Sequence, residues 1–283
     1  MTTDQKIKIL ELDPEAGMPG DESDVRAFFA SNGAKYYAAY LEKVLSEKVD
    51  CGSVPDIKIG SSVAEYEIVK GCGNYGQTMY VVKNGNEKFP GKGKALTALE
   101  TMKALVSKYK SCHDEKDNET SRDWRPFFES YLDTLTAFAY KAGSNNFKIV
   151  PRSSDLENIA ENFSQSSINK DYKSIDAPEL NRTKAEYNVD LTEEEVPKHE
   201  GWLMIAEGDV NTLKEFAHIA FKEYISSTKS GKGMSIYLRD KNDIKHDSVR
   251  SLVLGYGCYY DFNADGGSDL DDDARLLRIN ETK

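Results

Sequence analysis

The chain has few cysteines and histidines, and it has no long apolar run. Four cysteines and four histidines are spread over 283 residues, without a C-x-x-C pair or a histidine at zinc-finger spacing, so no structural zinc site is expected. No stretch approaches the roughly 20 apolar residues that cross a bilayer, and the first 17 residues lack the apolar core of a signal peptide. We therefore expect a cytoplasmic protein with free thiols and no membrane partner.

The composition is that of a folded protein. Hydrophobic residues make up 39% of the chain and aromatic residues 10%, well above the levels typical of disordered chains. The length suggests one large or two ordinary domains. We expect an N-terminal half at 1–150, an acidic linker or excursion at 151–200 that is poor in large aliphatics, and a C-terminal half at 201–283. A single continuous domain is the alternative.

Hydrophobic periodicity places strands and helices in both halves. The pattern predicts strands at 6–13, 56–60, 64–70, 77–83, 147–151, 201–209, 233–240, 248–263 and 274–279. It predicts helices at 24–48, 95–110, 124–143, 154–163 and 210–227. The order of elements indicates an α+β fold with mostly antiparallel sheets packed against amphipathic helices.

No local motif predicts an enzyme. Gly71, Gly73 and Gly76 satisfy G-x-G-x-x-G, but the strand predicted after them argues against a dinucleotide site, which needs a helix there. The fragments "YLRDKND" and "YYDFN" resemble protein-kinase motifs, yet too few residues follow Asp261 to build the kinase helical lobe. We name no catalytic residue and expect a non-enzymatic protein.

The charge is unevenly distributed. The net charge is −11, but residues 61–110 carry eight lysines against four acids, and residues 221–250 carry seven basic residues against four acids. In the first stretch the lysines are interleaved with Tyr66, Tyr75, Tyr80 and Phe89. Such a composition is typical of surfaces on which bases stack while cations hold phosphates. The predicted nucleic-acid-binding residues are Lys70, Tyr75, Tyr80, Lys83, Lys88, Lys92, Lys94, Lys229, Lys232, Arg239 and Lys241.

The stretch "DFNADGGSDLDDD" at 261–273 is unusually acidic. Its ligand spacing resembles that of an EF-hand or dockerin loop, with Asp261, Asn263, Asp265, Asp269 and Asp272 at positions 1, 3, 5, 9 and 12 and glycine at the turn. The resemblance implies a calcium site. The strand-like flanks, aspartate at position 12 and serine at position 8 depart from the family, and they favour an acidic hairpin instead.

Three functions therefore remain open. The first is binding of single-stranded RNA or DNA on a basic and aromatic sheet surface. The second is a protein-interaction or assembly module, with a protein partner or self-association and no nucleic acid. The third is a calcium-dependent or other metal-dependent protein that uses the loop at 261–272. No cofactor other than calcium is expected.

Overall fold

The computed structural model describes the chain from residue 57 onward, with gaps. The described residues are 57–59, 62–64, 66–114, 128, 130–159, 166–184, 187–225, 233–256, 262–267 and 269–280. All of them belong to one compact unit, Asp50–Lys283. The predicted strand at the N-terminus and the helix at 24–48 lie outside these residues.

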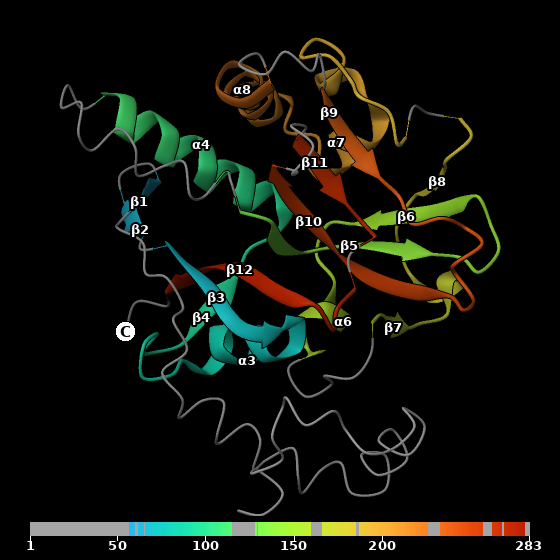
Figure 1. Cartoon of the computed structure of the whole chain (residues 1–283), viewed down its shortest axis with the longest axis horizontal. Coiled ribbons are helices and arrows are strands. Elements are labelled where there is room, and N and C mark those ends of the chain that lie inside the picture. Colours follow the sequence, from blue (N-terminus) through green and yellow to red (C-terminus); the bar gives the residue numbers. More distant parts are fainter. Residues whose placement is uncertain are drawn as a thin grey trace, which may run out of the picture. The chain divides into compact units, whose positions relative to one another are not determined.

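A ten-stranded mixed sheet forms the centre of the molecule (Figure 1). Its main path is β3-β12-β5-β10-β11-β9, with β4, β6, β7 and β8 attached at the sides. The strands are β3 (Tyr66–Asn74), β4 (Gly93–Ala95), β5 (Leu132–Tyr140), β6 (Asn146–Val150), β7 (Ile168–Asn169), β8 (Glu179–Asn181), β9 (Met234–Tyr237), β10 (Ser248–Tyr256), β11 (Phe262–Asp265) and β12 (Asp273–Asn280). A separate hairpin pairs β1 (Ile57–Ile59) with β2 (Ser62–Ala64).

The pairing is mostly antiparallel. Only β9 with β11, and one bridge between β12 and β5, run parallel among the described strands. β5 and β10 are central neighbours, and β6, β7 and β8 join the same sheet. The sheet thus contains strands from all three predicted segments, 1–150, 151–200 and 201–283. The fold is α+β.

The central strand β5 corrects one prediction. Residues 124–143 were expected to be helical, but Leu132–Tyr140 is a strand in which eight of nine residues are buried. Its threonines explain the difference, because β-branched residues suit a strand and their hydroxyls bond across the sheet. Thr134 donates to the carbonyl of Leu252 at 2.7 Å, and Thr136 donates to that of Pro151 at 2.7 Å. A strand buried on both faces has no alternation for a pattern to detect.

Two predicted strands are helices instead. Residues 77–83 lie in α3 (Tyr75–Asn84), whose first turn is capped by the Asn74 side chain accepting from the Gln77 amide at 3.1 Å. The first five of residues 201–209 lie in α7 (Glu200–Ile205). Consecutive valines suggested a strand in the first case, and a short apolar run did so in the second. Most of α3 is buried, and Trp202 and Ile205 of α7 are buried as well, so neither run shows the clear polar face that would have revealed a helix.

The long helices agree with the predictions. α4 (Ala98–Asp114) begins with a capping box, in which the Thr97 amide donates to the Glu100 carboxylate at 2.7 Å and the Glu100 amide donates to the Thr97 hydroxyl at 3.2 Å. α8 (Val210–Ala220) begins at the cap Asp209 and continues into a π-helical turn, Phe221–Ile225. The two helices pack against each other.

The segment 151–200 is built of short elements. It contains α6 (Ser154–Glu157), β7, a 3-10 turn at Tyr172–Ser174, β8 and a second 3-10 turn at Val196–Lys198. In the described part of the chain, no helix is both long and apolar enough to cross a membrane.

Candidate functional site

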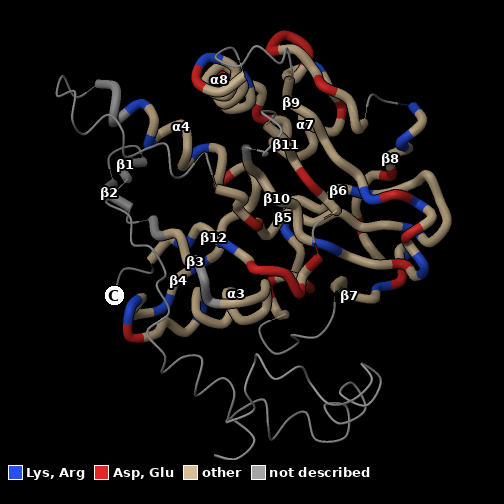
Figure 2. Tube along the Cα trace, in the orientation of Figure 1, with Lys and Arg blue, Asp and Glu red and all other residues tan. Residues whose placement is uncertain are grey.

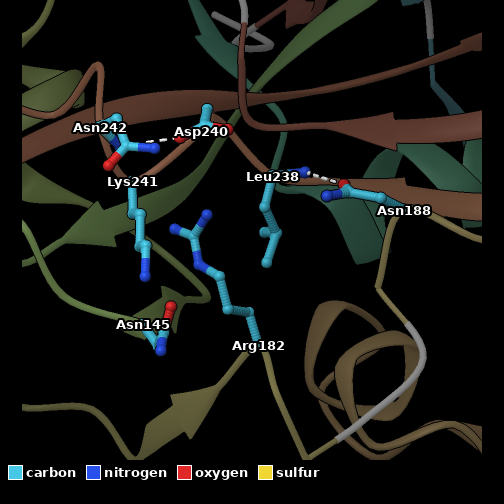
Figure 3. Close-up of a pocket in the computed structure, with 7 residues that line it drawn as sticks. All are labelled: Asn145, Arg182, Asn188, Leu238, Asp240, Lys241 and Asn242. Atoms are coloured by element: carbon cyan, nitrogen blue, oxygen red, sulfur yellow. Dashed lines mark hydrogen bonds between the residues drawn. The ribbon is translucent and has the colours of Figure 1, made fainter.

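A polar pocket opens where three loops meet beside the sheet (Figure 3). Its volume is about 270 Å³. The lining residues come from the β5–β6 turn, from the chain that follows β8, and from the loop after β9: Asn145, Arg182, Asn188, Leu238, Asp240, Lys241 and Asn242. Loops carried on a rigid sheet are the usual place for binding residues, so we take this pocket as the candidate site.

Local hydrogen bonds hold the pocket walls. The Asn188 amide donates to the carbonyl of Ile236 at 2.9 Å, and its side-chain oxygen accepts from the Leu238 amide at 2.7 Å. Asn188 has a positive φ of 60°, a conformation that asparagine tolerates better than most residues. The side chain of Asp240 accepts from the Asn242 amide at 2.8 Å and closes a tight turn.

Arg182 is anchored at the base of the pocket. Its amide donates to the carbonyl of Asn145 at 3.0 Å, and its Nη1 donates to the carbonyl of Arg239 at 2.7 Å. Its Nε and Nη2 are buried and have no hydrogen-bond partner among the residues that the structure describes. A buried polar group without a partner is costly, so this edge of the guanidinium marks the pocket as a place for a ligand or water.

The binding residues predicted in the stretch 61–110, called the first basic strip below, do not all lie on one exposed surface. Lys88, Lys92 and Lys94 are exposed around the turn beside β4, where Figure 2 shows basic residues gathered. Lys83 and Tyr80 are half-buried on α3, and Lys70 lies in β3 opposite Arg275. The exposed lysines and the half-buried Tyr80 are thus close in sequence, but they differ in their exposure to solvent.

Tyr75 corrects the predicted stacking surface. Its ring is fully buried, and its hydroxyl donates to the carbonyl of Thr134 at 2.9 Å. Phe89, also counted with the aromatic residues of this strip, is fully buried under Arg278. Neither ring can stack on a base in this arrangement, because tertiary packing has drawn both into the core.

The binding residues predicted in the stretch 221–250, the second basic strip, have different roles in the structure. Lys229 and Lys232 lie outside the described residues. Arg239 pairs with Asp269, at 2.8 Å between Nη1 and Oδ1, and Lys241 lines the pocket. Lys241 is thus the predicted residue that the structure brings into the candidate site. Arg182, Asn145 and Asn188 were missed because they lie outside the basic stretches, and no local sequence signal marks them.

The acidic stretch connects two strands that are not neighbours. β11 lies beside β10 and β9, whereas β12 lies beside β3 and β5, so the predicted hairpin is wrong and the stretch is a crossover between separate parts of the sheet. Strands were expected on both sides of the stretch: β12 follows it as expected, whereas β11 lies inside the stretch itself. The sequence pattern marks turn residues but does not tell which strands the turn joins.

The predicted calcium ligands have different environments. Asn263 is buried in β11, Asp265 accepts from the Gly267 amide, Asp272 is exposed, and Asp261 lies outside the described residues. Burial raises the pKa of Asp265. No group of three or more His, Cys, Asp or Glu side chains is placed to hold a metal in the described ranges. Calcium binding stays a prediction.

Asp269 joins two arginines under this stretch. Its Oδ1 contacts Nη1 of both Arg239 and Arg250, and Arg250 also donates to the carbonyl of Gly267 at 2.8 Å. The Arg250 side chain is only 4% exposed, and burial lowers its pKa. The aspartate therefore compensates a buried charge and fixes the crossover against β10.

Asp133 gives the fold a specific pH dependence. Its carboxylate accepts from the Ser251 hydroxyl at 2.7 Å and from the Arg275 amide at 3.2 Å, while burial raises its pKa to about 6. Because this folded value lies above the unfolded value of about 3.9, protonation stabilises the fold. The contribution is present below about pH 4 and is lost as the pH rises through about 6.

We expect Asp133→Asn to remove this contribution, because the amide does not titrate. Urea unfolding of the wild type and the variant from pH 4 to pH 8 measures it. The difference in unfolding free energy between the two proteins should change between pH 4 and pH 6 and stay level above pH 7. A constant difference over the whole range would show that Asp133 has an ordinary pKa.

The comparisons with known proteins support the fold assignment. No family model matches the chain, and no curated protein matches it. A solved structure from Nanoarchaeota, described as accommodating massive sequence variation by the C-type lectin fold, superposes with a TM-score of 0.53 over 78% of this chain and all of its own. The two sequences are 14% identical. At this identity the likeness concerns the fold, and this chain therefore has an α+β fold similar to the C-type lectin fold.

Proposed function

We propose that this chain is a non-enzymatic binding protein, a protein-interaction module that receives part of a protein partner in the pocket between the β5–β6 turn, the chain after β8 and the loop after β9. The observation that carries the proposal is the anchored Arg182, which lines a mostly polar pocket and whose Nε and Nη2 have no described hydrogen-bond partner. Loops around a rigid sheet can change in sequence while the sheet persists.

The structural neighbour supports the same proposal. It is described as accommodating massive sequence variation by the C-type lectin fold. In the chain described above, the core is formed by buried residues of the sheet and helices, and the pocket is formed by loop residues. A binding role for the loops is consistent with that division.

A protein partner is favoured over nucleic acid for two reasons. The pocket of about 270 Å³ is slightly smaller than the roughly 300–1,000 Å³ of sites that enclose small molecules, so it suits one side chain or chain terminus. Tyr75 and Phe89, which would have stacked on bases, are buried. Single-stranded nucleic acid remains the second candidate, because Lys88, Lys92 and Lys94 are exposed together.

Selection of displayed random peptides on the purified protein tests the proposal. Asn242 is exposed at the pocket, and only its backbone takes part in the hydrogen bonds that hold the turn, so Asn242→Trp should block the pocket without disturbing the loop. We expect the selected peptides to bind the variant at least about tenfold more weakly, equivalent to about 1.4 kcal/mol. Asn158→Trp, an exposed asparagine after α6, is the control and should bind like the wild type.

Binding of a single-stranded RNA oligonucleotide is measured beside the peptides at low and high salt. If RNA binding weakens with salt and is unchanged in Asn242→Trp, the exposed lysines and not the pocket form the binding surface. Peptides that bind Asn242→Trp as tightly as the wild type would contradict a role for the pocket, as would a failure to select any peptide.

A further inference from the structure

Arg182 lines the pocket, and one edge of its guanidinium is buried without a hydrogen-bond partner in the described part of the chain. Nη1 is occupied by the carbonyl of Arg239, whereas Nε and Nη2 have no partner in the described part of the chain. Nε and Nη2 lie side by side on the planar group and donate in the same direction. This is the edge with which arginine holds the two oxygens of a carboxylate or a phosphate.

A second cation lies beside this edge. Figure 3 shows the Lys241 side chain running beside the guanidinium of Arg182, with its terminal nitrogen above Asn145. No ion pair is recorded for either side chain within the described ranges. Two like charges that converge in a pocket repel each other unless an anion lies between them.

The acid in the pocket wall is directed elsewhere. The Asp240 carboxylate accepts from the Asn242 amide and lies beside Asn242 in Figure 3, away from the guanidinium. The other polar residues of the lining are the three asparagines, whose amides can donate to an oxyanion or accept from a neighbouring group. The lining therefore offers donors to an anion.

We propose that the pocket is an anion site that takes one carboxylate or phosphate group, held side-on by Nε and Nη2 of Arg182 with Lys241 as the second charge. The volume of about 270 Å³ fits a single group of this kind at the end of a larger ligand. This inference rests on the proposed binding function and names the chemistry that the pocket recognises.

Titration of the intact protein with small anions tests the inference. The probes are inorganic phosphate and acetate, each added at constant ionic strength against sodium chloride, and the readout is the ¹⁵N signal of the Arg182 Nε–H group. We expect this signal to shift and saturate with phosphate, with acetate or with both, and the arm that saturates identifies the class of anion. Chloride alone should leave it unchanged.

Two variants assign the effect to the pocket. Arg182→Lys keeps the charge but removes the side-on edge, and Lys241→Gln removes the second charge. Anion affinity is measured for the variants by calorimetry. Each variant should bind about tenfold more weakly or worse. Lys184→Gln removes an exposed lysine two residues from Arg182 that does not line the pocket, and it should bind like the wild type.

The outcomes separate this inference from the proposed function. No saturable shift with either anion, or full anion affinity in Arg182→Lys, would overturn the anion site. If Arg182→Lys does not fold, full anion affinity in Lys241→Gln overturns it equally. If the wild type binds neither anion but Asn242→Trp weakens peptide binding, the anion site is absent and the protein is still a binding module. If every pocket variant keeps both its anion binding and its peptide binding, the anion site and the proposed function are both contradicted.

Discussion

Replacing Asp269 with alanine should lower the free energy of unfolding by about 3 kcal/mol, the low end of the range for breaking a buried ion pair. The reason is Arg250, whose side chain is 4% exposed and contacts the Asp269 carboxylate. Without that carboxylate, a buried guanidinium keeps its charge in a region of low polarity. The Asp269 side chain is itself 37% exposed, which is why the upper part of the range is not expected.

Urea unfolding at pH 7 measures this loss. Asp271→Ala and Asp272→Ala are matched controls, because both aspartates are exposed in the same acidic stretch. They should change the unfolding free energy by no more than about 0.5 kcal/mol. If Asp269→Ala is as stable as these controls, the carboxylate does not compensate Arg250, and the crossover is held by other contacts.

Truncating Phe262 to alanine should cost about 3–5 kcal/mol, the usual range for a buried phenylalanine. Phe262 is fully buried in β11 and meets Phe216 of α8 edge-on, with 5.1 Å between ring centroids. It also meets Phe128 at 6.3 Å. The ring therefore joins the sheet to the helix layer, and its removal leaves a cavity where the two meet.

Thermal and urea unfolding of two variants separate loss of volume from loss of shape. Phe262→Leu keeps most of the apolar volume and should cost less than about 2 kcal/mol. A Phe262→Ala protein that unfolds within about 1 kcal/mol of the wild type would show that α8 does not depend on this contact. The same residue belongs to the kinase-like fragment "YYDFN", and its burial indicates a packing role there.

The sequence predicted both long helices and several strands. α4 and α8 carry apolar residues at helical spacing beside a polar face, and both were predicted as helices. β9 and β12 were predicted as strands and are strands. In these elements the local pattern and the tertiary environment agree, which is the condition under which periodicity is informative.

Prediction failed at one central strand and at two helices. β5 was expected to be a helix, and α3 and α7 were expected to be strands. β5 and α3 are largely buried and half of the residues of α7 are, so their apolar residues do not follow one clear period. Secondary structure is set there by tertiary contacts, such as the hydrogen bonds of the Thr134 and Thr136 hydroxyls across the sheet.

The candidate site was harder to predict than the fold. Lys241 was named because it lies in a basic stretch, but Arg182 lies in an acidic one and gains its role from the carbonyl of Arg239, 57 residues away. Charge counting along the chain finds cations that are neighbours in sequence. It does not find cations that the fold brings together from distant segments, and the pocket depends on such a pair.

Amide hydrogen exchange with and without a selected peptide tests the central claim most directly. We predict that the peptide slows exchange in the loops that form the pocket, at residues 141–146, 182–184, 187–190 and 238–245, and leaves residues 84–95 unchanged. Protection at 84–95 with unchanged pocket loops would contradict the account, because it would place the partner on the exposed lysines beside β4.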